Sequence, residues 1–384
     1  MINSPVSNRK LQQGNPLRIL YFSRDYSPHD RRFLTALAET RHRVGFIRLE
    51  NHSKTPVTDL PQQIGILDWA GGKERISPFD WFRLYRSLKT VLADFKPDVV
   101  MAGPVQRAAL LTALTGFSPL VSVSWGYDLL LDANRNSLWR WATRFTLEHS
   151  SVFVGDCEII RSRAVAFGMN PARTVIFPYG ADIDFYTPGE NPALREKTGW
   201  NKDAFVLLSS RSWEPMYGVT DLVRAFILAE KRCPALRLVM VGSGSQDAEI
   251  RGLIASAKIS DKVHFAGRVP MEDLRLFYRA ADLFVSATYS DGTSISLLEA
   301  YACGLPVLVS DIPGNTEWVE PGKTGWLFPT GMIEALADAM VAAYEQRQNL
   351  PDMGRAAREL AEQRGDWKNN FPRLLKAFEL ASKS

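Results

Sequence analysis

The sequence predicts an α/β protein with two doubly wound domains, each built on a parallel sheet. The first observation is the length, because 384 residues are too many for one comfortable core and suit two domains. The second is the periodicity. Short apolar strands alternate with amphipathic helices along the chain, which is typical of parallel sheets with helices on both faces. The composition, 46% hydrophobic and 23% charged, is that of an ordinary globular chain.

The N-terminal half contains seven predicted strands. They are Arg18–Phe22, Val44–Arg48, Ile64–Leu67, Val99–Ala102, Leu120–Val123, Val152–Val154 and Thr174–Phe177. Helices are expected between them, and their starts lie near Pro28, Phe79, Pro104, Ser137 and Ile159. Residues 1–16 are polar and lack the apolar centre of a secretory signal, so we expect a disordered lead-in.

A second series of strands and helices follows the segment Pro178–Pro188, which has turn residues at both ends. Its predicted strands are Val206–Ser209, Leu238–Val241, Val263–Ala266, Leu283–Val285 and Val307–Val309. Its helices are expected to start near Gly218, Gln246, Met271, Thr293 and Ile333, and Asp366 is a predicted N-cap of the last helix. We therefore expect an N-terminal domain over residues 17–185, a C-terminal domain over 186–365, and a final helix over 366–384.

Charge is divided unevenly between the two halves. Residues 1–185 hold 23 Lys and Arg against 17 Asp and Glu, whereas residues 186–384 hold 23 against 25. A basic N-terminal half indicates an anionic partner, and no nucleic-acid-binding signature accompanies it. The segment Trp81–Lys89 mixes aromatic and basic residues as interfacial helices do, which favours an anionic membrane surface. An ordinary helix with a solvated basic edge is the simpler interpretation of the same segment.

The sequence offers no pattern typical of a metal site. Three cysteines lie without a CxxC spacing, which argues against a disulfide framework or a zinc site and suits a reducing cytoplasm. No histidine has metal-ligand spacing. Asp182 and Asp184 spell an Asp-x-Asp motif, but it falls in the predicted linker and is interpreted as structural. We therefore expect neither a metal nor another cofactor.

Two carboxylates bracket a predicted helix N-terminus in the C-terminal half. Asp291 lies in the loop after a strand, Thr293 and Ser294 open the helix, and Glu299 lies about two turns inside it. A helix N-terminus is a ready anion site, whereas the two acids suit sugar or ribose hydroxyls. The alternative is that Asp291 only caps the helix and Glu299 is solvated.

Three other loops follow predicted strands, at the edge where open α/β sheets bind ligands. Arg211 leaves the first strand, where its guanidinium can hold a diphosphate through two hydrogen bonds. Gly242 and Gly244 form the second loop. Gly267 lies in the third, where it lets a ligand approach the backbone closely.

The run from Asp291 to Glu299, followed by Ala300, Ala302, Gly304, Pro306 and Val307, resembles the signature of family 4 glycosyltransferases, the group 1 transferases. That resemblance implies a GT-B fold, with two Rossmann-like doubly wound domains facing each other across a cleft. The final helix would pack back on the N-terminal domain. It also implies that Asp291, where Glu is usual, holds the donor sugar together with the backbone of Gly292, Thr293 and Ser294. Glu299 would bind the ribose.

The resemblance extends to the remaining loops. It places Arg211 on the donor diphosphate. The family usually has a lysine about five residues later on the same diphosphate; this lysine is missing here, and Tyr217 stands just before Gly218. Gly242 and Gly244 match a VGxGP turn. Gly267, Arg268 and Val269 match an FxGxV turn that contacts the nucleobase. In the N-terminal half, Asp128 matches the acid of an HGxD motif; as a base, an acceptor-orienting group or a helix cap, its role stays open.

Together with these features, the resemblance implies a metal-independent, retaining glycosyltransferase of the hexosyltransferase type. It would move a sugar from a nucleoside-diphosphate sugar, with UDP favoured over GDP, to a glycan or lipid-linked acceptor in cell-surface polysaccharide or glycolipid synthesis. We expect it in the cytoplasm, peripheral on the inner face of the membrane. The alternatives are a GT-B sugar-nucleotide 2-epimerase, which needs more histidines than this chain offers, and a non-catalytic nucleotide-sugar-binding partner of a transferase.

Overall fold

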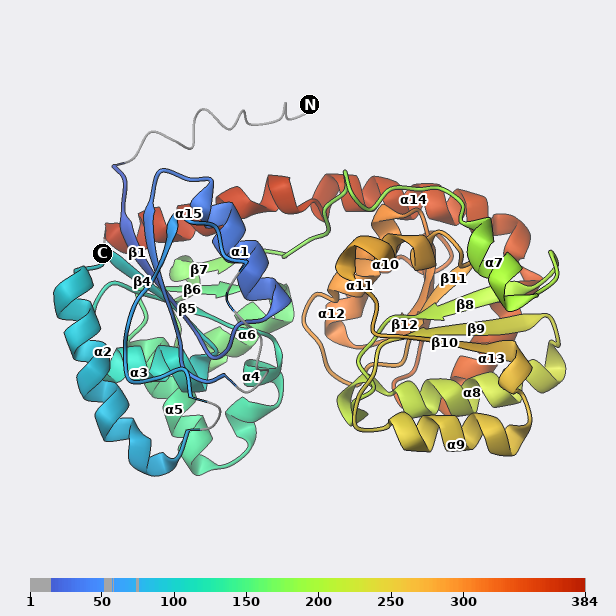
Figure 1. Cartoon of the computed structure of the whole chain (residues 1–384), viewed down its shortest axis with the longest axis horizontal. Coiled ribbons are helices and arrows are strands. Elements are labelled where there is room, and N and C mark those ends of the chain that lie inside the picture. The colour runs from blue at the N-terminus through green and yellow to red at the C-terminus, as the bar shows by residue number, and fades with distance from the viewer. Residues whose placement is uncertain (1–14, 52–56, 58, 74–75, 384) are drawn as a thin grey trace. The chain divides into compact units, whose positions relative to one another are not determined.

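The computed structural model describes residues 15–51, 57, 59–73 and 76–383. The predicted lead-in over residues 1–16 lies almost wholly outside this part of the chain. Two compact units divide the polypeptide (Figure 1). Unit 1 is Met1–Phe177 with Phe371–Ser384, and unit 2 is Pro178–Asn370.

Unit 1 is built on a seven-stranded parallel sheet with the order β3-β2-β1-β4-β5-β6-β7. The strands are β1 Arg18–Ser23, β2 Arg43–Arg48, β3 Ile64–Ile66, β4 Val99–Gly103, β5 Leu120–Val123, β6 Val152–Gly155 and β7 Thr174–Ile176. Its helices are α1 Pro28–Ala38, α2 Trp81–Phe95, α3 Leu110–Leu114, α4 Tyr127–Leu130, α5 Ser137–Glu148 and α6 Glu158–Ala166. Helices cover both faces of the sheet (Figure 1), so its central strands are almost wholly buried and mainly apolar.

Unit 2 repeats this architecture with a six-stranded parallel sheet in the order β10-β9-β8-β11-β12-β13. The strands are β8 Phe205–Ser209, β9 Leu236–Val241, β10 Val263–Gly267, β11 Leu283–Ser286, β12 Val307–Ser310 and β13 Gly325–Phe328. The helices are α7 Pro192–Thr198, α8 Val219–Arg232, α9 Asp247–Ala257, α10 Met271–Tyr278, α11 Ile295–Ala302, α12 Pro313–Thr316, α13 Ile333–Glu345 and α14 Leu350–Arg364. Helix α15, Trp367–Ser382, runs from the end of unit 2 into unit 1.

Each strand predicted from the sequence is present, and the predicted fold class is confirmed. Strand β13 and helices α4, α7, α12 and α14 were not predicted. β13 is a short edge strand with two half-buried residues, and its apolar run is too brief to stand out. Gly325 begins it where a Cβ would lie 2.1 Å from the Val307 carbonyl oxygen. The predicted N-cap of the last helix is confirmed, since Asp366 accepts hydrogen bonds from the Lys368 and Asn369 amides.

Strand order reverses once in each unit, and this reversal determines where a ligand can sit. In unit 1 the chain continues from β1 to β2 on one side and later to β4 on the other. In unit 2 the corresponding neighbours of β8 are β9 and β11. Ligands of doubly wound sheets bind beyond the carboxyl ends of the strands at such a switch point.

The segment predicted as the linker, Pro178–Pro188, is fastened to the core of unit 2. The Ala181 amide donates to the Gly365 carbonyl at 2.7 Å. The Arg358 guanidinium, from α14, donates to three carbonyl oxygens: Ile183 at 3.1 Å, Tyr186 at 2.8 Å and Ala302 at 2.6 Å. One side chain therefore joins the start of unit 2 to the end of α11.

Replacing Arg358 should destabilise unit 2, because three carbonyl oxygens would lose a donor at once. We expect Arg358→Gln to lower the free energy of unfolding by about 2–3 kcal/mol in urea titrations. Arg355→Gln is the matched control on the same helix, where the arginine side chain is 70% exposed, and it should change stability by less than about 0.5 kcal/mol. Equal effects of the two substitutions would contradict this role.

Candidate functional site

The guanidinium of Arg211 lies at the switch point of unit 2, two residues beyond β8. Its Nη2 donates to Asp291 Oδ2 at 2.7 Å, and its Nη1 donates to Ser294 Oγ at 2.9 Å and Ser296 Oγ at 3.0 Å. These three partners come from the loop after β11 and the start of α11, so two neighbouring strands supply one cluster. Only 11% of the arginine side chain is exposed.

Tyr217 lies against the same guanidinium. The Arg211 Cζ atom is 4.3 Å from the centroid of the Tyr217 ring, a cation–π contact. Burial is the largest influence on the pKa of Arg211 and lowers it, but the charge and hydrogen bond of Asp291, together with Tyr217 and Tyr278, outweigh burial and the pKa is raised. The cation is therefore permanent. The Nε–H of Arg211 has no hydrogen-bond partner among the described residues, so the group keeps a free donor.

Gly218 fixes the turn that carries Tyr217. Its φ is +60°, a left-handed conformation that favours glycine, and a Cβ there would lie 2.1 Å from the Ala287 carbonyl oxygen. The turn thus packs directly on the end of β11, which brings Tyr217 and Arg211 to the same edge of the sheet.

Helix α11 begins at Ile295 with Ser294 as its N-cap, two residues later than predicted. The interpretation of Asp291 as the helix cap is wrong, because the N-cap is Ser294 and the Asp291 carboxylate accepts from Arg211. Thr293 and Ser294 are buried. The backbone of Gly292 packs against Gly314: a Cβ added to Gly314 would lie 2.1 Å from the carbonyl oxygen of Gly292.

Glu299 is oriented by a tyrosine that sequence reasoning missed. Tyr278, the last residue of α10, is 1% exposed, and its hydroxyl donates to Glu299 Oε2 at 2.8 Å. Ser210 Oγ lies 3.0 Å from the same hydroxyl. Burial, together with the charge of Glu299, raises the pKa of Tyr278 well above its ordinary value, so the phenol stays protonated as a donor. The sequence did contain one signal for this contact. Tyr278 ends the apolar face of a predicted helix, and the hydroxyl of a buried tyrosine needs a hydrogen-bond partner.

The glycine loops after β9 and β10 meet the loop that carries Arg211. A Cβ on Gly242 would lie 2.6 Å from the Arg211 carbonyl oxygen, and one on Gly244 would lie 2.4 Å from that of Trp213. The Gly242 amide donates to the Gly267 carbonyl at 2.8 Å. A Cβ on Gly267, by contrast, would meet open space. The backbone beside Gly267 is accessible to a flat ligand.

Side chains after Gly267 complete this edge. Arg268 is exposed and its Nε donates to Ser243 Oγ at 2.6 Å, which ties the third loop to the second. Val269 is half-buried and packs on the cluster that contains Tyr278. The structure therefore brings together every predicted site residue of unit 2, from the ends of β8, β9, β10 and β11.

Asp128 belongs to unit 1, where it is fully buried. Its Oδ1 accepts from Ser124 Oγ at 2.6 Å and the Trp125 amide at 3.1 Å, and its Oδ2 accepts from the Val105 amide at 3.0 Å. Burial raises the pKa of its carboxyl to about 6, although these hydrogen bonds oppose the shift. In this geometry the side chain holds the loops after β4 and β5 in place.

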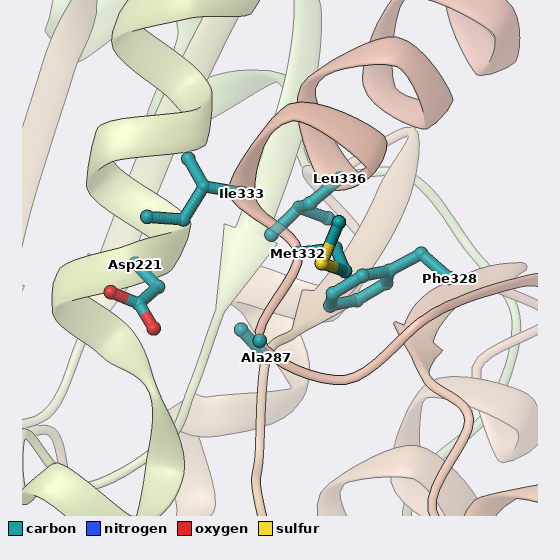
Figure 2. A pocket seen from close by; sticks show the side chains of 7 residues that line it. Asp221, Ala287, Phe328, Met332, Ile333 and Leu336 are labelled. Atoms are coloured by element: carbon teal, nitrogen blue, oxygen red, sulfur yellow. The ribbon is translucent and has the colours of Figure 1, made fainter.

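A narrow hollow in unit 2 lies apart from this cluster. Its lining comes mainly from α8, β13 and α13 and includes Asp221, Ala287, Phe328, Met332, Ile333 and Leu336 (Figure 2). The one charged residue in this lining, Asp221, already accepts a hydrogen bond from the Tyr289 hydroxyl. None of the predicted site residues lines the hollow.

The described residues contain no group of three or more His, Cys, Asp and Glu arranged to hold a metal ion. The interpretation of the Asp-x-Asp motif as structural is confirmed, since Asp182 Oδ1 accepts from the Asp184 amide at 3.1 Å and the Phe185 amide at 3.2 Å. The three cysteines are buried and form no disulfide.

The raised pKa of Asp128 predicts a pH dependence. A carboxyl with a pKa of about 6 in the folded state and about 3.9 in the unfolded chain binds its proton more tightly when folded. The free energy of unfolding should therefore fall as pH rises from about 4 to about 6, by up to roughly 3 kcal/mol.

Urea titrations across this pH range test the sign. Asp128→Asn does not titrate there, so wild type should lose stability relative to this variant as pH rises. Asp94→Asn, an exposed acid on α2, serves as control. If the difference in unfolding free energy between wild type and Asp128→Asn stays constant as pH rises, or grows in favour of wild type, the raised pKa of the buried carboxyl is contradicted.

Comparisons with known proteins identify a family for both halves of the chain. A model of "Glycosyl transferases group 1" matches residues 190–360, and one of a "Glycosyl transferase 4-like domain" matches residues 28–180. The structure resembles Anabaena HepE in complex with UDP, with a TM-score of 0.78 at 20% identity, covering 94% of this chain and all of that one. Sucrose-phosphate synthase from Thermosynechococcus elongatus also gives 0.78, at 18% identity, covering 94% and 98%.

Curated relatives extend the comparison. The D-inositol 3-phosphate glycosyltransferase of Pseudarthrobacter chlorophenolicus is 32% identical over 219 residues, which is 56% of this chain and 52% of that protein. A GDP-mannose-dependent monoacylated α-(1-6)-phosphatidylinositol monomannoside mannosyltransferase of Corynebacterium glutamicum is 26% identical over 291 residues, 72% of each. The chain thus spans about half the length of the first of these relatives. With both domains matched, the two-sheet fold in place and the first signature acid paired with Arg211, the chain belongs to the group 1 glycosyltransferases of family 4 and has the GT-B fold.

Proposed function

We propose that this protein is a retaining glycosyltransferase that takes a sugar from a nucleoside-diphosphate sugar, with UDP as the favoured nucleotide. The observation that carries the proposal is the buried Arg211 at the switch point of unit 2, with Asp291 and the start of α11 around it. The UDP complex of the similar Anabaena protein supports a uridine nucleotide. The GDP-mannose named for the Corynebacterium relative keeps GDP as the alternative.

Arg211 and the N-terminus of α11 would stabilise the departing diphosphate. Negative charge grows on the leaving group as the bond to the sugar breaks, and donors already fixed in place stabilise it without reorganisation. Such donors are the Nε–H of Arg211 and the first amides of α11, which a helix does not pair internally. Tyr217 replaces a lysine of the family. Its ring holds the guanidinium from one side but adds no charge, so a single cation has to serve the diphosphate.

The two acids of the signature would have separate tasks. Asp291, beside Arg211, would accept hydrogen bonds from the sugar and fix the anomeric carbon toward the acceptor. Glu299, whose carboxylate is aligned by Tyr278, would accept from the ribose hydroxyls. Gly267, Arg268 and Val269 would present backbone groups to the nucleobase.

The acceptor is proposed to be a glycan or a lipid-linked molecule bound by unit 1, in which Asp128 positions the surrounding loops. The named relatives act on an inositol phosphate and on a phosphatidylinositol mannoside, and both names support a polar, phosphate-bearing acceptor. Synthesis of cell-surface polysaccharide or glycolipid is the process that such an acceptor would serve.

Helix α2 supports a peripheral contact with an anionic membrane. Leu84, Leu88 and Val91 are buried against the sheet, whereas Phe82 is 71% exposed with the Arg86 guanidinium 5.8 Å from its ring centroid. An exposed aromatic flanked by arginine suits a headgroup layer on the cytoplasmic face. Among the described residues, no helix combines the length and apolarity that crossing a bilayer requires.

Donor binding without a metal tests the proposed function. Calorimetry with UDP and a panel of UDP- and GDP-sugars, all with EDTA present, should show binding, and UDP-sugar turnover should follow when a crude lipid fraction is added. Binding that needs added Mn²⁺ or Mg²⁺ would contradict the metal-free site. Donor binding with no turnover under any acceptor condition would favour a non-catalytic partner.

The two acids should respond differently to substitution. Glu299→Gln should weaken UDP and UDP-sugar alike by about 1–3 kcal/mol, because a charged acceptor is lost. Asp291→Asn should leave UDP affinity unchanged or slightly tighter, since it frees Arg211, while turnover falls about tenfold or more. Glu345→Gln, an exposed acid at the end of α13, is the control. Equal losses of UDP affinity in the Asp291 and Glu299 variants would refute this division.

Docking on anionic lipid should depend on salt and on Phe82. Co-sedimentation with vesicles that contain phosphatidylglycerol should decline steeply as salt rises toward 1 M, where screening acts over a few ångströms. Phe82→Ser should reduce binding, whereas Leu228→Ser, which removes an exposed apolar side chain from unit 2, should not. Equal recovery on neutral and anionic vesicles would exclude electrostatic docking.

A further inference from the structure

Four neighbouring strands of unit 1 end at one cluster of charged side chains. Arg24 follows β1 directly, Glu50 follows β2, Arg107 lies in the π-helical turn after β4, and Tyr127 opens α4 after β5. In the sheet these strands are adjacent in the order β2-β1-β4-β5. The cluster therefore occupies the switch point of unit 1, the place where a doubly wound sheet binds a ligand.

Glu50 is shared by both arginines. It is 7% exposed, its Oε2 accepts from Arg24 Nε at 3.1 Å, and its Oε1 lies 3.8 Å from Arg107 Nη1. Tyr127 also interacts with Arg24 and, with Glu50, raises the pKa of its guanidinium against the effect of burial. One carboxylate thus faces two guanidiniums, which leaves one positive charge in excess at this point. The nearby acids Asp128 and Asp132 act on Tyr127 through their charge.

Arg107 has hydrogen-bonding capacity that the fold does not use. Its guanidinium donates no hydrogen bond to any residue that the structure describes, although only 31% of the side chain is exposed. The group is held by the distant Glu50 oxygen and by Trp139, whose ring centroid is 5.1 Å from Cζ. An arginine stacked on an aromatic ring keeps its planar fork of donors free, the arrangement that suits bidentate binding of phosphate.

A purely structural explanation accounts for only one of the two arginines. Neutralising the buried Glu50 requires a single cation, and Arg24 already supplies it through a hydrogen bond at 3.1 Å. The guanidinium of Arg107 is not needed to neutralise Glu50. A partly buried charge without hydrogen bonds is also energetically costly.

We propose that Arg24 and Arg107 form a binding site for a phosphate group, and that this group belongs to the acceptor. The assignment to the acceptor rests on the proposed function, whereas the phosphate site itself does not. The chemistry recognised is a phosphate ester of a polyol, either free in solution or in a lipid headgroup. Arg107 would present its fork to two phosphate oxygens, and Arg24, anchored by Glu50 and Tyr127, would add charge behind them.

Calorimetry with glycerol 3-phosphate tests the site directly. UDP is kept saturating so that the anion-binding groups of unit 2 are occupied. Wild type should bind the ester, Arg107→Gln should weaken binding about tenfold, and Arg107→Lys should recover part of the loss as a point charge. Arg163→Gln removes an exposed arginine on α6 of the same unit and should behave as wild type. Because Arg24 still pairs with Glu50, we expect each variant to keep its melting temperature and its UDP affinity.

Vesicles distinguish the two sources of the phosphate. If phosphatidylinositol in phosphatidylcholine vesicles binds in an Arg107-dependent way and glycerol 3-phosphate does not compete, the group belongs to a lipid. If glycerol 3-phosphate binds and competes, a soluble ester suffices. Equal affinity of wild type and Arg107→Gln for both probes, or no binding of either, would overturn the proposal. If UDP does not bind but the Arg107-dependent phosphate binding persists, the donor assignment fails and the phosphate site stands.

Discussion

The ion pair between Arg211 and Asp291 is the constraint on which the proposed donor site depends. A guanidinium that is 11% exposed is stable only where its charge and its donors are met, and Asp291, Ser294 and Ser296 do this together. These three partners can reach the guanidinium only if the loop after β8 lies against the start of α11. The geometry of the two loops and the position of the cation are therefore one property of the fold.

The same ion pair would have to change when a nucleotide sugar binds. Asp291 occupies a donor of Arg211 that a diphosphate would also use, so a nucleotide competes with a carboxylate already in place. A diphosphate carries more charge than Asp291 and can accept from several donors at once. Release of Asp291 from the guanidinium would then free its oxygens for the hydroxyls of the sugar. The substitution of the usual glutamate by the shorter aspartate matters here, because its reach is limited to the immediate neighbourhood of Arg211.

The sequence was sufficient to predict the strands that are buried on both faces and to point to the loops at their carboxyl ends, for physical reasons. Strands buried on both faces are continuous apolar runs, and β1, β4 and β12 are unmistakable examples. Strand β13 escaped because an edge strand of four residues lacks such a run. The contacts of Arg211 with Asp291 and of Tyr278 with Glu299 join residues 80 and 21 positions apart. Periodicity is a local signal and cannot predict such pairs, so Tyr278 and the Arg107 cluster were found only in three dimensions.

A crystal structure of the protein with UDP bound, grown in the presence of EDTA, tests the central claim most directly. The account predicts diphosphate oxygens within hydrogen-bonding distance of Arg211, the ribose hydroxyls on Glu299 with Tyr278 still behind it, and the uracil beside the backbone of Gly267. A nucleotide bound elsewhere in unit 2, or a diphosphate held by other groups while Arg211 remains wholly engaged with Asp291, Ser294 and Ser296, would contradict it.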